Sequence, residues 1–304
     1  MLGRFRRFVL EAYERSLERE ISDPPEHIAV IQDGNRRYAR QAGQAVTDGH
    51  REGAETSKQI LEWCRDVGVE ELTLYAFSTE NFDRPAEERE HLFDLITEKL
   101  EEIADEPEIH ENEVRIRAIG EIDRLPARVR QAARYAEERT ADYQEFRLNV
   151  ALAYGGRAEL LTATRAIATD VDQGIIDPDD IDVGEIERRL HNGDVTDVDL
   201  IIRTGGDERT SNFLPWHANG NEAAVYFCHP YWPEFSKRDF LRAIRTYQYR
   251  EQRWRHSRIE RAVSILRAFG DRDMSRARRI LGLPPSDRHE TGATTDTSPP
   301  ETAD

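Results

Sequence analysis

Short runs of β-branched and other apolar residues alternate along the chain with longer segments whose apolar residues recur at helical spacing. Apolar runs of about four to eight residues, bounded by turn residues, are typical of buried strands, and apolar positions three or four apart are typical of amphipathic helices. This pattern predicts strands at 27–32, 71–77, 114–119, 146–152, 198–203 and 223–228. It predicts helices at 35–42, 50–66, 86–104, 124–139, 156–171, 183–191 and 236–252, and two further helices at 257–270 and 273–281.

Regular alternation of strands and helices predicts an α/β fold, a single domain with a central, mostly parallel six-stranded sheet flanked by helices. A chain of 304 residues can bury one substantial core or two small ones, and it shows no internal repeat. We therefore place one domain at 23–256 and a helical extension at 257–283. The segment 284–304 is rich in Pro, Thr, Asp and Glu, a composition that predicts a disordered tail.

Residues 1–22 are predicted to form an N-terminal amphipathic helix. Its apolar residues are spaced for one face, at Phe5, Phe8, Val9, Tyr13 and Leu17. We expect this face to pack against the domain. Contact with a membrane surface through the neighbouring arginines is the alternative.

The most informative segment is Asp33-Gly34-Asn35-Arg36-Arg37, which directly follows the first predicted strand. Gly34 permits a sharp exit from the strand, and the residues after it favour a helix. Asp33 would then stand beside helix N–H groups and two guanidinium groups, which together suit a metal-bound phosphorylated ligand. By itself, the segment could equally be an ordinary turn.

Two later segments repeat this chemistry after predicted strands. The first is 76–85, with the sequence AFSTENFDRP, and the second is 203–213, with the sequence RTGGDERTSNF. Gly205 and Gly206 allow close approach of the backbone to a ligand, and Arg203, Arg209 and Ser211 offer donors to phosphate oxygens. Since ligands of α/β sheets bind at the carboxyl ends of strands, the three segments are expected to form one site.

These three segments, in this order, resemble the cis-prenyltransferases, the undecaprenyl diphosphate synthase family. The resemblance covers roughly residues 25–255, and its further marks are the segments 49–54 (GHREGA), 148–157 (LNVALAYGGR) and 232–235 (WPEF). Any one of them could arise by chance, but the ordered set is highly specific. The resemblance implies a cis-prenyltransferase fold with a hydrophobic tunnel beside the active cleft.

The resemblance also implies roles for individual residues. Asp33 and Glu222 match metal-linked carboxylates, and Asn81 matches a residue near the proton-transfer step. Residues matching the allylic diphosphate site or bordering that substrate are Gly34, Asn35, Arg36, Arg37, Tyr38, His50 and Phe82. Those matching the isopentenyl diphosphate site, or neighbouring it in the motifs, are Ser78, Thr79, Glu80, Arg84, Arg203, Arg209, Thr210 and Ser211.

The implied reaction joins isopentenyl diphosphate repeatedly to an allylic diphosphate and makes a long polyprenyl diphosphate, the precursor of a glycosyl carrier lipid. Magnesium is the expected cofactor, and a homodimer is the expected assembly. The starter would be geranylgeranyl diphosphate in an archaeal enzyme and farnesyl diphosphate in a bacterial one. An amide such as Asn81 is a poor base, so we expect it to position the substrate, and the proton acceptor stays open.

Three departures from the family pattern stand out. Val46 occupies a position where bacterial members carry an arginine for the allylic diphosphate, and Arg36 occupies one where they carry glycine. Two residues are inserted after Glu222, which affects where that carboxylate points. Arg253-Trp254-Arg255 replaces an Arg-x-Gly turn that reaches across the dimer in the family, and the glycine's tolerance of positive φ is lost.

Composition bounds the setting of this chemistry. The net charge is −17, and lysine occurs only at 58, 99 and 237, which is typical of proteins from halophiles. Such a charge argues against nucleic acid or an anionic membrane as a general partner, so membrane contact would be peripheral at most. Two cysteines, Cys64 and Cys228, are too few for a disulfide framework and fit a cytoplasmic protein.

Other classes of protein fit the sequence less well. Helical trans-type prenyl synthases hold their metals with DDxxD pairs, but the nearest match, at 179–182, has the wrong spacing. The Gly-x-x-x-x-Gly-Lys loop of nucleotide-binding motors does not occur. The remaining alternative is a non-catalytic scaffold subunit of a cis-prenyltransferase complex, which would have no reason to keep Asp33 and Asn81.

Overall fold

The fold is built around one six-stranded sheet in which every pair of neighbouring strands is parallel. The computed structural model describes the backbone of residues 2–190, 196–219 and 223–268, and side chains within 10–190, 196–218 and 223–253. The strands are β1 (His27–Ile31), β2 (Glu71–Ser78), β3 (Val114–Ile119), β4 (Phe146–Tyr154), β5 (Leu200–Arg203) and β6 (Ala224–Phe227). Six strands flanked by helices confirm the predicted fold class, and the sheet is parallel throughout.

The helices follow the predicted pattern and include two short ones, at 107–111 and 215–219, that were not predicted. They are α1 (Leu2–Glu20), α2 (Asn35–Ala42), α3 (Val46–Val67), α4 (Ala86–Asp105), α5 (Pro107–Glu111), α6 (Ala127–Arg139), α7 (Gly156–Asp172), α8 (Val183–Glu187), α9 (Pro215–Asn219) and α10 (Lys237–Ala268). Helix α3 begins four residues earlier than predicted because the Asp48 carboxylate accepts a hydrogen bond from the N–H of Ala45, at 3.2 Å, and caps the first turn.

The prediction of separate helices at 236–252 and 257–270 was wrong, because α10 is continuous from Lys237 to Ala268. No glycine or proline interrupts 252–257, so no residue there favours a break. The predicted helix at 273–281 and the predicted tail at 284–304 lie outside the described residues. Contacts divide the chain into two units, residues 1–251, which contain the whole sheet, and residues 252–304.

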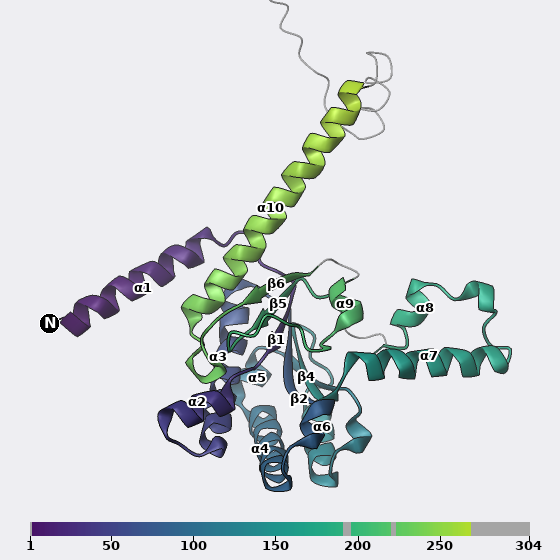
Figure 1. Cartoon of the computed structure of the whole chain (residues 1–304), viewed down its shortest axis with the longest axis horizontal. Coiled ribbons are helices and arrows are strands. Elements are labelled where there is room, and N and C mark those ends of the chain that lie inside the picture. The colour runs from purple at the N-terminus through teal and green to yellow at the C-terminus, as the bar shows by residue number, and fades with distance from the viewer. Residues whose placement is uncertain (1, 191–195, 220–222, 269–304) are drawn as a thin grey trace, which may run out of the picture. The chain divides into compact units, whose positions relative to one another are not determined.

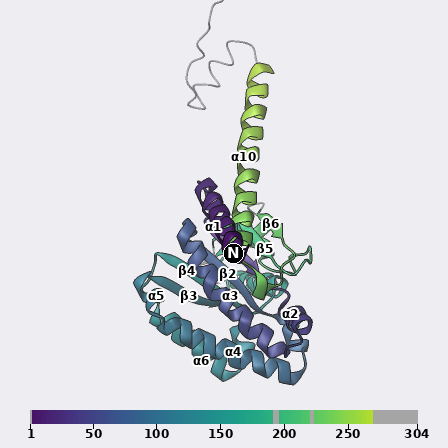
Figure 2. The same ribbon diagram turned by 90° about the vertical axis from the view of Figure 1, so that its left-hand side faces the viewer.

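Strands β1 and β5, near the middle of the sheet, are buried on both faces, which explains why they are nearly continuous apolar runs. Along β1, Ile28 and Val30 join one core cluster, while Ala29 and Ile31 join another on the opposite face. A third cluster, centred on Phe77, fills the space under α4 and α6. These two helices lie side by side in both views (Figure 1 and Figure 2).

The strand order is β3-β4-β2-β1-β5-β6, so β2, β3 and β4 lie on one side of β1, and β5 and β6 lie on its other side. The order therefore reverses between β1 and β5. In open α/β sheets, the crevice at the carboxyl ends of the strands at such a reversal is the usual ligand site. The register pairs Ile31 with Arg203, so the residues that follow β1 meet the end of β5.

None of the helices in the described ranges is long and apolar enough to cross a lipid bilayer.

A buried polar network ties together the strand starts at the opposite end of the sheet. The Glu71 carboxylate accepts hydrogen bonds from Asn149 Nδ2 at 2.6 Å, Thr196 Oγ1 at 2.7 Å and Arg147 Nε at 2.9 Å. Burial opposes ionisation of Glu71, but positive neighbours and these donors hold its pKa below the ordinary value. The network thus keeps a charged carboxylate inside the fold.

We predict that Glu71→Gln lowers the free energy of unfolding by about 2–4 kcal/mol, because an amide presents its own N–H to one of these donors and leaves buried groups unpaired. Urea unfolding measures the change. Glu98→Gln, at an exposed position on α4, is the control and should stay within about 0.5 kcal/mol. Equal stability of the two variants would contradict the assignment.

Candidate active site

A polar cleft of about 360 Å³ opens at the carboxyl ends of the strands, where the strand order reverses. It is lined by Gln32, Asp33, Gly34, Asn35, Arg36, Arg37, Arg40, His50, Arg84, Asp207 and Arg209. These side chains come from segments far apart in the sequence, and five of the eleven are arginines. The cleft therefore concentrates positive charge within a chain whose net charge is −17.

The turn from β1 into α2 depends on glycine at position 34. Gly34 has φ 108°, in the left-handed region, and a Cβ there would lie 2.6 Å from the ring of Tyr231. Only glycine fits this position, because any side chain would be strained at this positive φ and would clash with Tyr231. It sets Asp33 and the first turn of α2, which has N–H groups without partners inside the helix, along one wall of the cleft.

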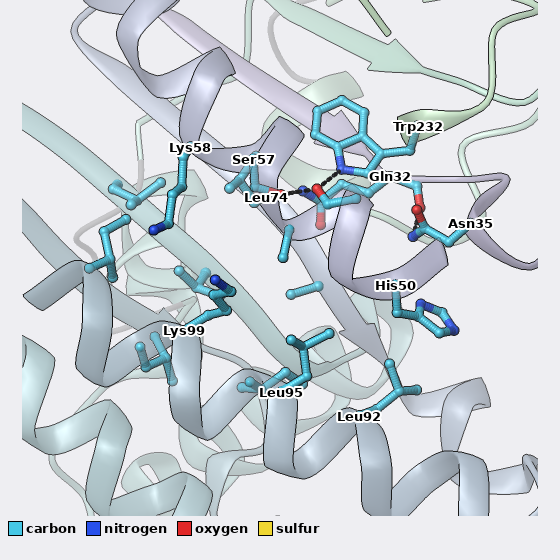
Figure 3. A pocket seen from close by; sticks show the side chains of 18 residues that line it. Gln32, Asn35, His50, Ser57, Lys58, Leu74, Leu92, Leu95, Lys99 and Trp232 are labelled. Atoms are coloured by element: carbon cyan, nitrogen blue, oxygen red, sulfur yellow. Dashed lines mark hydrogen bonds between the residues drawn. The ribbon is translucent and has the colours of Figure 1, made fainter. Parts of the chain in front are cut away.

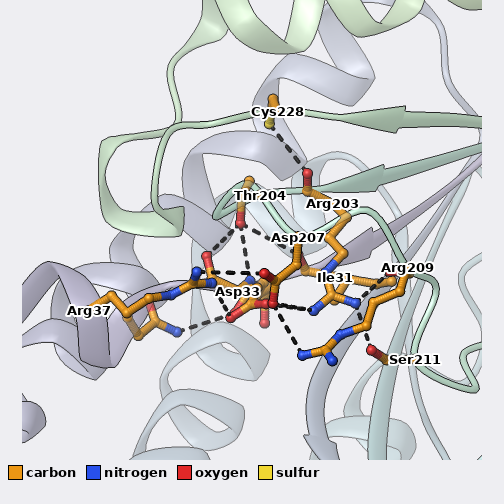
Figure 4. A network of polar contacts seen from close by, with 11 residues as sticks. Ile31, Asp33, Arg37, Arg203, Thr204, Asp207, Arg209, Ser211 and Cys228 are labelled. Atoms are coloured by element: carbon orange, nitrogen blue, oxygen red, sulfur yellow. Dashed lines mark hydrogen bonds and ion pairs between the residues drawn. The ribbon is translucent and has the colours of Figure 1, made fainter.

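Asp33 is held by two guanidinium groups from different elements. Its carboxylate accepts a hydrogen bond from Arg203 Nη2 at 2.7 Å and contacts Arg37 Nη2 at 3.1 Å (Figure 4). Burial would raise the pKa of Asp33, but its hydrogen bonds to Arg203 and Arg37 and their charges outweigh burial and lower it. The carboxylate is therefore ionised at neutral pH.

The backbone of Asp33 is fixed by a buried hydroxyl group and by the backbone N–H of Trp232. Thr204 Oγ1 donates to the carbonyl oxygen of Asp33 at 2.7 Å and accepts from its N–H at 3.1 Å. The N–H of Trp232 donates to the same carbonyl at 3.0 Å, and the Trp232 indole N–H donates to the carbonyl of Gly53 on α3 at 2.7 Å. Asp33 therefore has little freedom to move relative to β5 and α3.

Arg203 is the first residue of the third predicted segment, 203–213. It is only 3% exposed, and it donates to Ser211 Oγ at 2.6 Å as well as to Asp33. Asp207 lies 3.4 Å from Arg203 Nη2 and 3.2 Å from Arg209 Nη2. Arg203 thus holds Asp33 and Ser211 in place inside the protein. Arg209, with 70% of its side chain exposed, is accessible to a ligand.

A second charge cluster borders the cleft around Glu88 on α4. Its carboxylate lies 2.8 Å from Arg84 Nη1, 3.5 Å from Arg36 Nε and 3.8 Å from His50 Nε2. Burial and the nearby Arg84 charge lower the pKa of His50 to about 4, although Glu88 opposes the shift. His50 is therefore neutral at physiological pH.

Several predicted residues lie beside the cleft and do not line it. The Tyr38 hydroxyl donates to Glu52 at 2.6 Å, and the Asn81 amide oxygen accepts from the N–H of Ser78 at 2.9 Å at the start of a short 3₁₀ helix (Thr79–Asp83). Phe82 packs edge-on against Phe77, with ring centroids 5.1 Å apart. Thr79, Glu80, Thr210 and Ser211 likewise do not line the cleft, and Glu222 lies outside the described residues.

Four residues that line or border the cleft were not predicted from the sequence: Gln32, Arg40 and Asp207, which line it, and Glu88, which borders it. Asp207 sits inside the third motif, four residues after Arg203, and its charge alone could have indicated a pairing. Glu88 follows Arg84 by four residues at the start of a predicted helix, the spacing of a helical ion pair. Arg40 had no comparable signal, because its place depends on how α2 packs.

An apolar pocket of about 140 Å³ adjoins the polar cleft, and Gln32, Asn35 and His50 line both. Its walls are α3, α4 and strands β2 and β4, with Leu74, Leu92, Leu95 and Leu100 among the lining residues (Figure 3). The site thus places a cationic cleft next to a hydrocarbon-lined cavity. A ligand with an anionic head and an apolar tail would fit both.

The cleft also has oxygen ligands suited to magnesium. Asp33 and Asp207 share Arg203 and Arg37 as neighbours, so both carboxylates face the same small region. In the described part of the chain no group of three or more His, Cys, Asp or Glu side chains is arranged to hold a metal ion. Magnesium commonly takes one or two carboxylates and completes its shell with water and substrate phosphates, so this donor set fits it.

Comparison with known proteins gives the class to which this fold and site belong. A family model described as "Putative undecaprenyl diphosphate synthase" matches residues 31–255. The chain therefore belongs to the undecaprenyl diphosphate synthase family of prenyltransferases, which confirms the resemblance seen in the sequence.

Individual relatives are similar over most of their length. The chain is 64% identical, over 88% of its length and 89% of the relative's, to a protein of Halobacterium salinarum named tritrans,polycis-undecaprenyl-diphosphate synthase (geranylgeranyl-diphosphate specific). A Haloarcula marismortui protein of the same name is 57% identical, over 95% and 97% of the two chains. The same name belongs to a Methanocaldococcus jannaschii protein that is 49% identical, over 81% and 89%.

Solved structures of similar proteins share the fold. Lavandulyl diphosphate synthase from Lavandula x intermedia, crystallised with dimethylallyl diphosphate, superposes with a TM-score of 0.68 at 32% identity, over 74% of this chain and 95% of that one. A probable undecaprenyl diphosphate synthase from Campylobacter jejuni superposes with a TM-score of 0.60 at 30% identity, over 75% and 96%.

We predict that Arg203→Met raises the pKa of Asp33, because the methionine removes the stronger of the two guanidinium contacts and leaves the burial. Carboxyl carbon NMR titration, with Asp33→Asn used to assign the signal, measures the shift. Arg209→Met is the matched control: Arg209 contacts Asp207 and should move the pKa of Asp33 less. An unchanged Asp33 pKa in Arg203→Met would contradict the pairing.

Proposed function

We propose that this protein condenses isopentenyl diphosphate sequentially, with cis geometry, onto geranylgeranyl diphosphate to make a long, undecaprenyl-type polyprenyl diphosphate. The observation that carries the proposal is the junction of the arginine-rich cleft with the apolar pocket at Gln32, Asn35 and His50. The names of the archaeal relatives support the starter and the product. The product would serve as the precursor of a glycosyl carrier lipid.

The two diphosphates are proposed to bind in adjacent parts of the cleft. The allylic diphosphate would take the α2 side, where Gly34, Asn35, Arg36 and Arg37 offer N–H groups and guanidinium groups next to the apolar pocket. Isopentenyl diphosphate would take the β5 side, beside the exposed Arg209. Arg40 lines the cleft and adds a cation near the allylic side.

Asp33, with Asp207 or Glu222, would hold magnesium. The ion, when bound, would neutralise part of the negative charge that develops on the departing diphosphate. The arginines that line the cleft would stabilise the same negative charge. Their N–H groups already point into the cleft, so they can bind the diphosphate oxygens without rearrangement as the bond between C1 and oxygen breaks. Arg203 contributes indirectly, because it holds Asp33 in place.

Each condensation forms a bond between C4 of isopentenyl diphosphate and C1 of the allylic substrate, breaks the C1–oxygen bond and releases one proton. His50, with a pKa of about 4, and Asp33, with a lowered pKa, are weak bases at neutral pH. We therefore favour an oxygen of the departing diphosphate as the proton acceptor. Asn81 is proposed to position the 3₁₀ segment that borders the site.

A region around α7 and α8 exposes apolar side chains. The two helices lie side by side (Figure 1), and Leu161, Ile175 and Val183 in this region are 55%, 65% and 61% exposed. Apolar side chains gathered on one region suit a subunit contact, and we propose a homodimer there. Free, buried Cys64 and Cys228 support a reducing cytoplasm, and the acidic, lysine-poor composition supports work in concentrated salt.

We expect the purified protein, in molar KCl with magnesium, to incorporate labelled isopentenyl diphosphate into long polyprenyl products. Geranylgeranyl diphosphate should be used at least about ten-fold more efficiently than farnesyl diphosphate, a discrimination of about 1.4 kcal/mol, because the relatives are named for that starter. Chromatography of parallel reactions measures starter and product together. No incorporation with either starter would support the non-catalytic scaffold alternative.

We predict that Asp33→Asn lowers incorporation by at least about 100-fold, because it removes the charge that a metal and the surrounding arginines require. The asparagine keeps the shape of the side chain, so the fold should persist. Asp94→Asn, on the outer surface of α4, should retain full activity. Undiminished incorporation by folded Asp33→Asn would refute the metal role.

A further inference from the structure

The end of the third segment has an unusual backbone conformation. Ser211, Asn212 and Leu214 have φ of 48°, 60° and 45°, in the left-handed region that residues with a side chain rarely adopt. Asparagine visits this region more readily than serine or leucine does. Such a conformation persists only where surrounding contacts hold it in place, and it is concentrated at functional sites.

Asn212 caps a helix that lies far from it in the sequence. Its backbone carbonyl accepts a hydrogen bond from the N–H of Gly156, and its side-chain Oδ1 accepts one from the N–H of Arg157, both at 2.9 Å. These are the first two N–H groups of α7, which have no acceptor inside the helix. Gly155, at the N-cap position, has no side chain to cap them. Asn212 therefore supplies the acceptors that the start of α7 lacks.

Two glycines in the turn from β4 into α7 let Asn212 come this close. A Cβ on Gly156 would lie 3.0 Å from the carbonyl oxygen of Asn212. A Cβ on Gly155 would lie 3.4 Å from Asn212 Nδ2 and 2.7 Å from the hydroxyl oxygen of Thr79, which belongs to the segment 76–85. The turn is thus packed against both this segment and the third one.

Asn212 also adjoins the residues that surround Arg203. Ser211 Oγ accepts a hydrogen bond from Arg203 Nη1 at 2.6 Å, and the carbonyl oxygen of Arg209 accepts from the same nitrogen (Figure 4). The chain from Arg209 to Ser211 is therefore wrapped around one guanidinium group and continues directly into the cap on α7. A shift of Asn212 would move the serine and the arginine that offer donors on the β5 side of the cleft.

We propose that Asn212 is a positioning residue for isopentenyl diphosphate, because its cap on α7 fixes where Ser211 and Arg209 stand. The inference rests on the proposed function, in which this diphosphate binds beside the exposed Arg209. Asparagine suits the position because it adopts a positive φ and offers a side-chain acceptor at the same time. The allylic diphosphate binds on the α2 side, where the turn at Gly34 sets the geometry instead, so the effect of Asn212 is selective for one substrate.

The test is the steady-state kinetics of Asn212→Gly, with labelled isopentenyl diphosphate, geranylgeranyl diphosphate and magnesium. Glycine accepts the positive φ but lacks the side-chain acceptor, so the N–H of Arg157 loses its partner. We expect the KM for isopentenyl diphosphate to rise about ten-fold, the effect of a lost hydrogen bond, and the KM for geranylgeranyl diphosphate to stay unchanged. Asn212→Asp keeps both the acceptor and the tolerance of positive φ, and it should restore the wild-type KM.

Arg157→Pro tests the same contact from its other partner, and it decides the question if Asn212→Gly does not fold. Proline is tolerated in the first turn of a helix and removes the N–H that Asn212 accepts, so the same selective rise in KM is expected. Asp182→Gly is the matched control. The Asp182 side chain also caps a helix, α8, by accepting from the N–H of Glu185 at 2.8 Å, but it does not line the cleft. Its two KM values should equal those of the wild type.

Three results would overturn the inference alone. They are an unchanged KM for isopentenyl diphosphate in the folded variants that break the cap, an equal rise in KM for both substrates, and an equal rise in Asp182→Gly. Failure of Asn212→Asp to restore the KM would also contradict it. No incorporation by the wild-type protein would instead overturn the proposed function, and the inference with it.

Discussion

The site depends on the pairing of Asp33 with Arg203 across the junction of β1 and β5. The parallel register sets Ile31 beside Arg203, so a carboxylate two residues beyond one strand meets the last side chain of the next. Arg203 is nearly buried, and its guanidinium group would be costly there without an anion. Asp33 satisfies it and is held in turn by Thr204. One ion pair therefore fixes both sides of the cleft relative to each other.

This arrangement concentrates positive charge in a protein that is otherwise strongly acidic. Cations that point into the cleft, such as Arg37 and Arg209, remain accessible, while Arg203 is used internally. A solvated acidic surface would repel a diphosphate, but a recessed cluster of arginines focuses the local field and attracts it. The diphosphate head of a prenyl diphosphate would bind in this polar cleft, and its hydrocarbon tail would bind in the adjoining apolar pocket. Affinity for the head and room for the tail thus come from different elements of one fold.

Much of this was predictable because the signals were local. The strand runs, the Asp33–Gly34 turn and helix α2 follow from apolar periodicity and from the backbone freedom of glycine, and α2 was predicted at its observed bounds. The arginine-rich ends of β1 and β5 were predicted to meet, because the carboxyl ends of parallel strands share one edge. The continuous α10 was not predicted, although no breaker residue separates its two halves.

The sequence by itself determined the fold class, the family and the residue types at the cleft, since each depends on patterns within short segments. Only the tertiary structure decided which of those residues face the cleft, that Asn81 caps its own segment and that Glu88 gathers Arg36, His50 and Arg84. It also decided that Lys58 on α3 and Lys99 on α4 both donate to Glu102 beside the apolar pocket. The physical reason is that side-chain direction and pairing depend on how helices pack, and packing joins residues whose separation in sequence carries no signal.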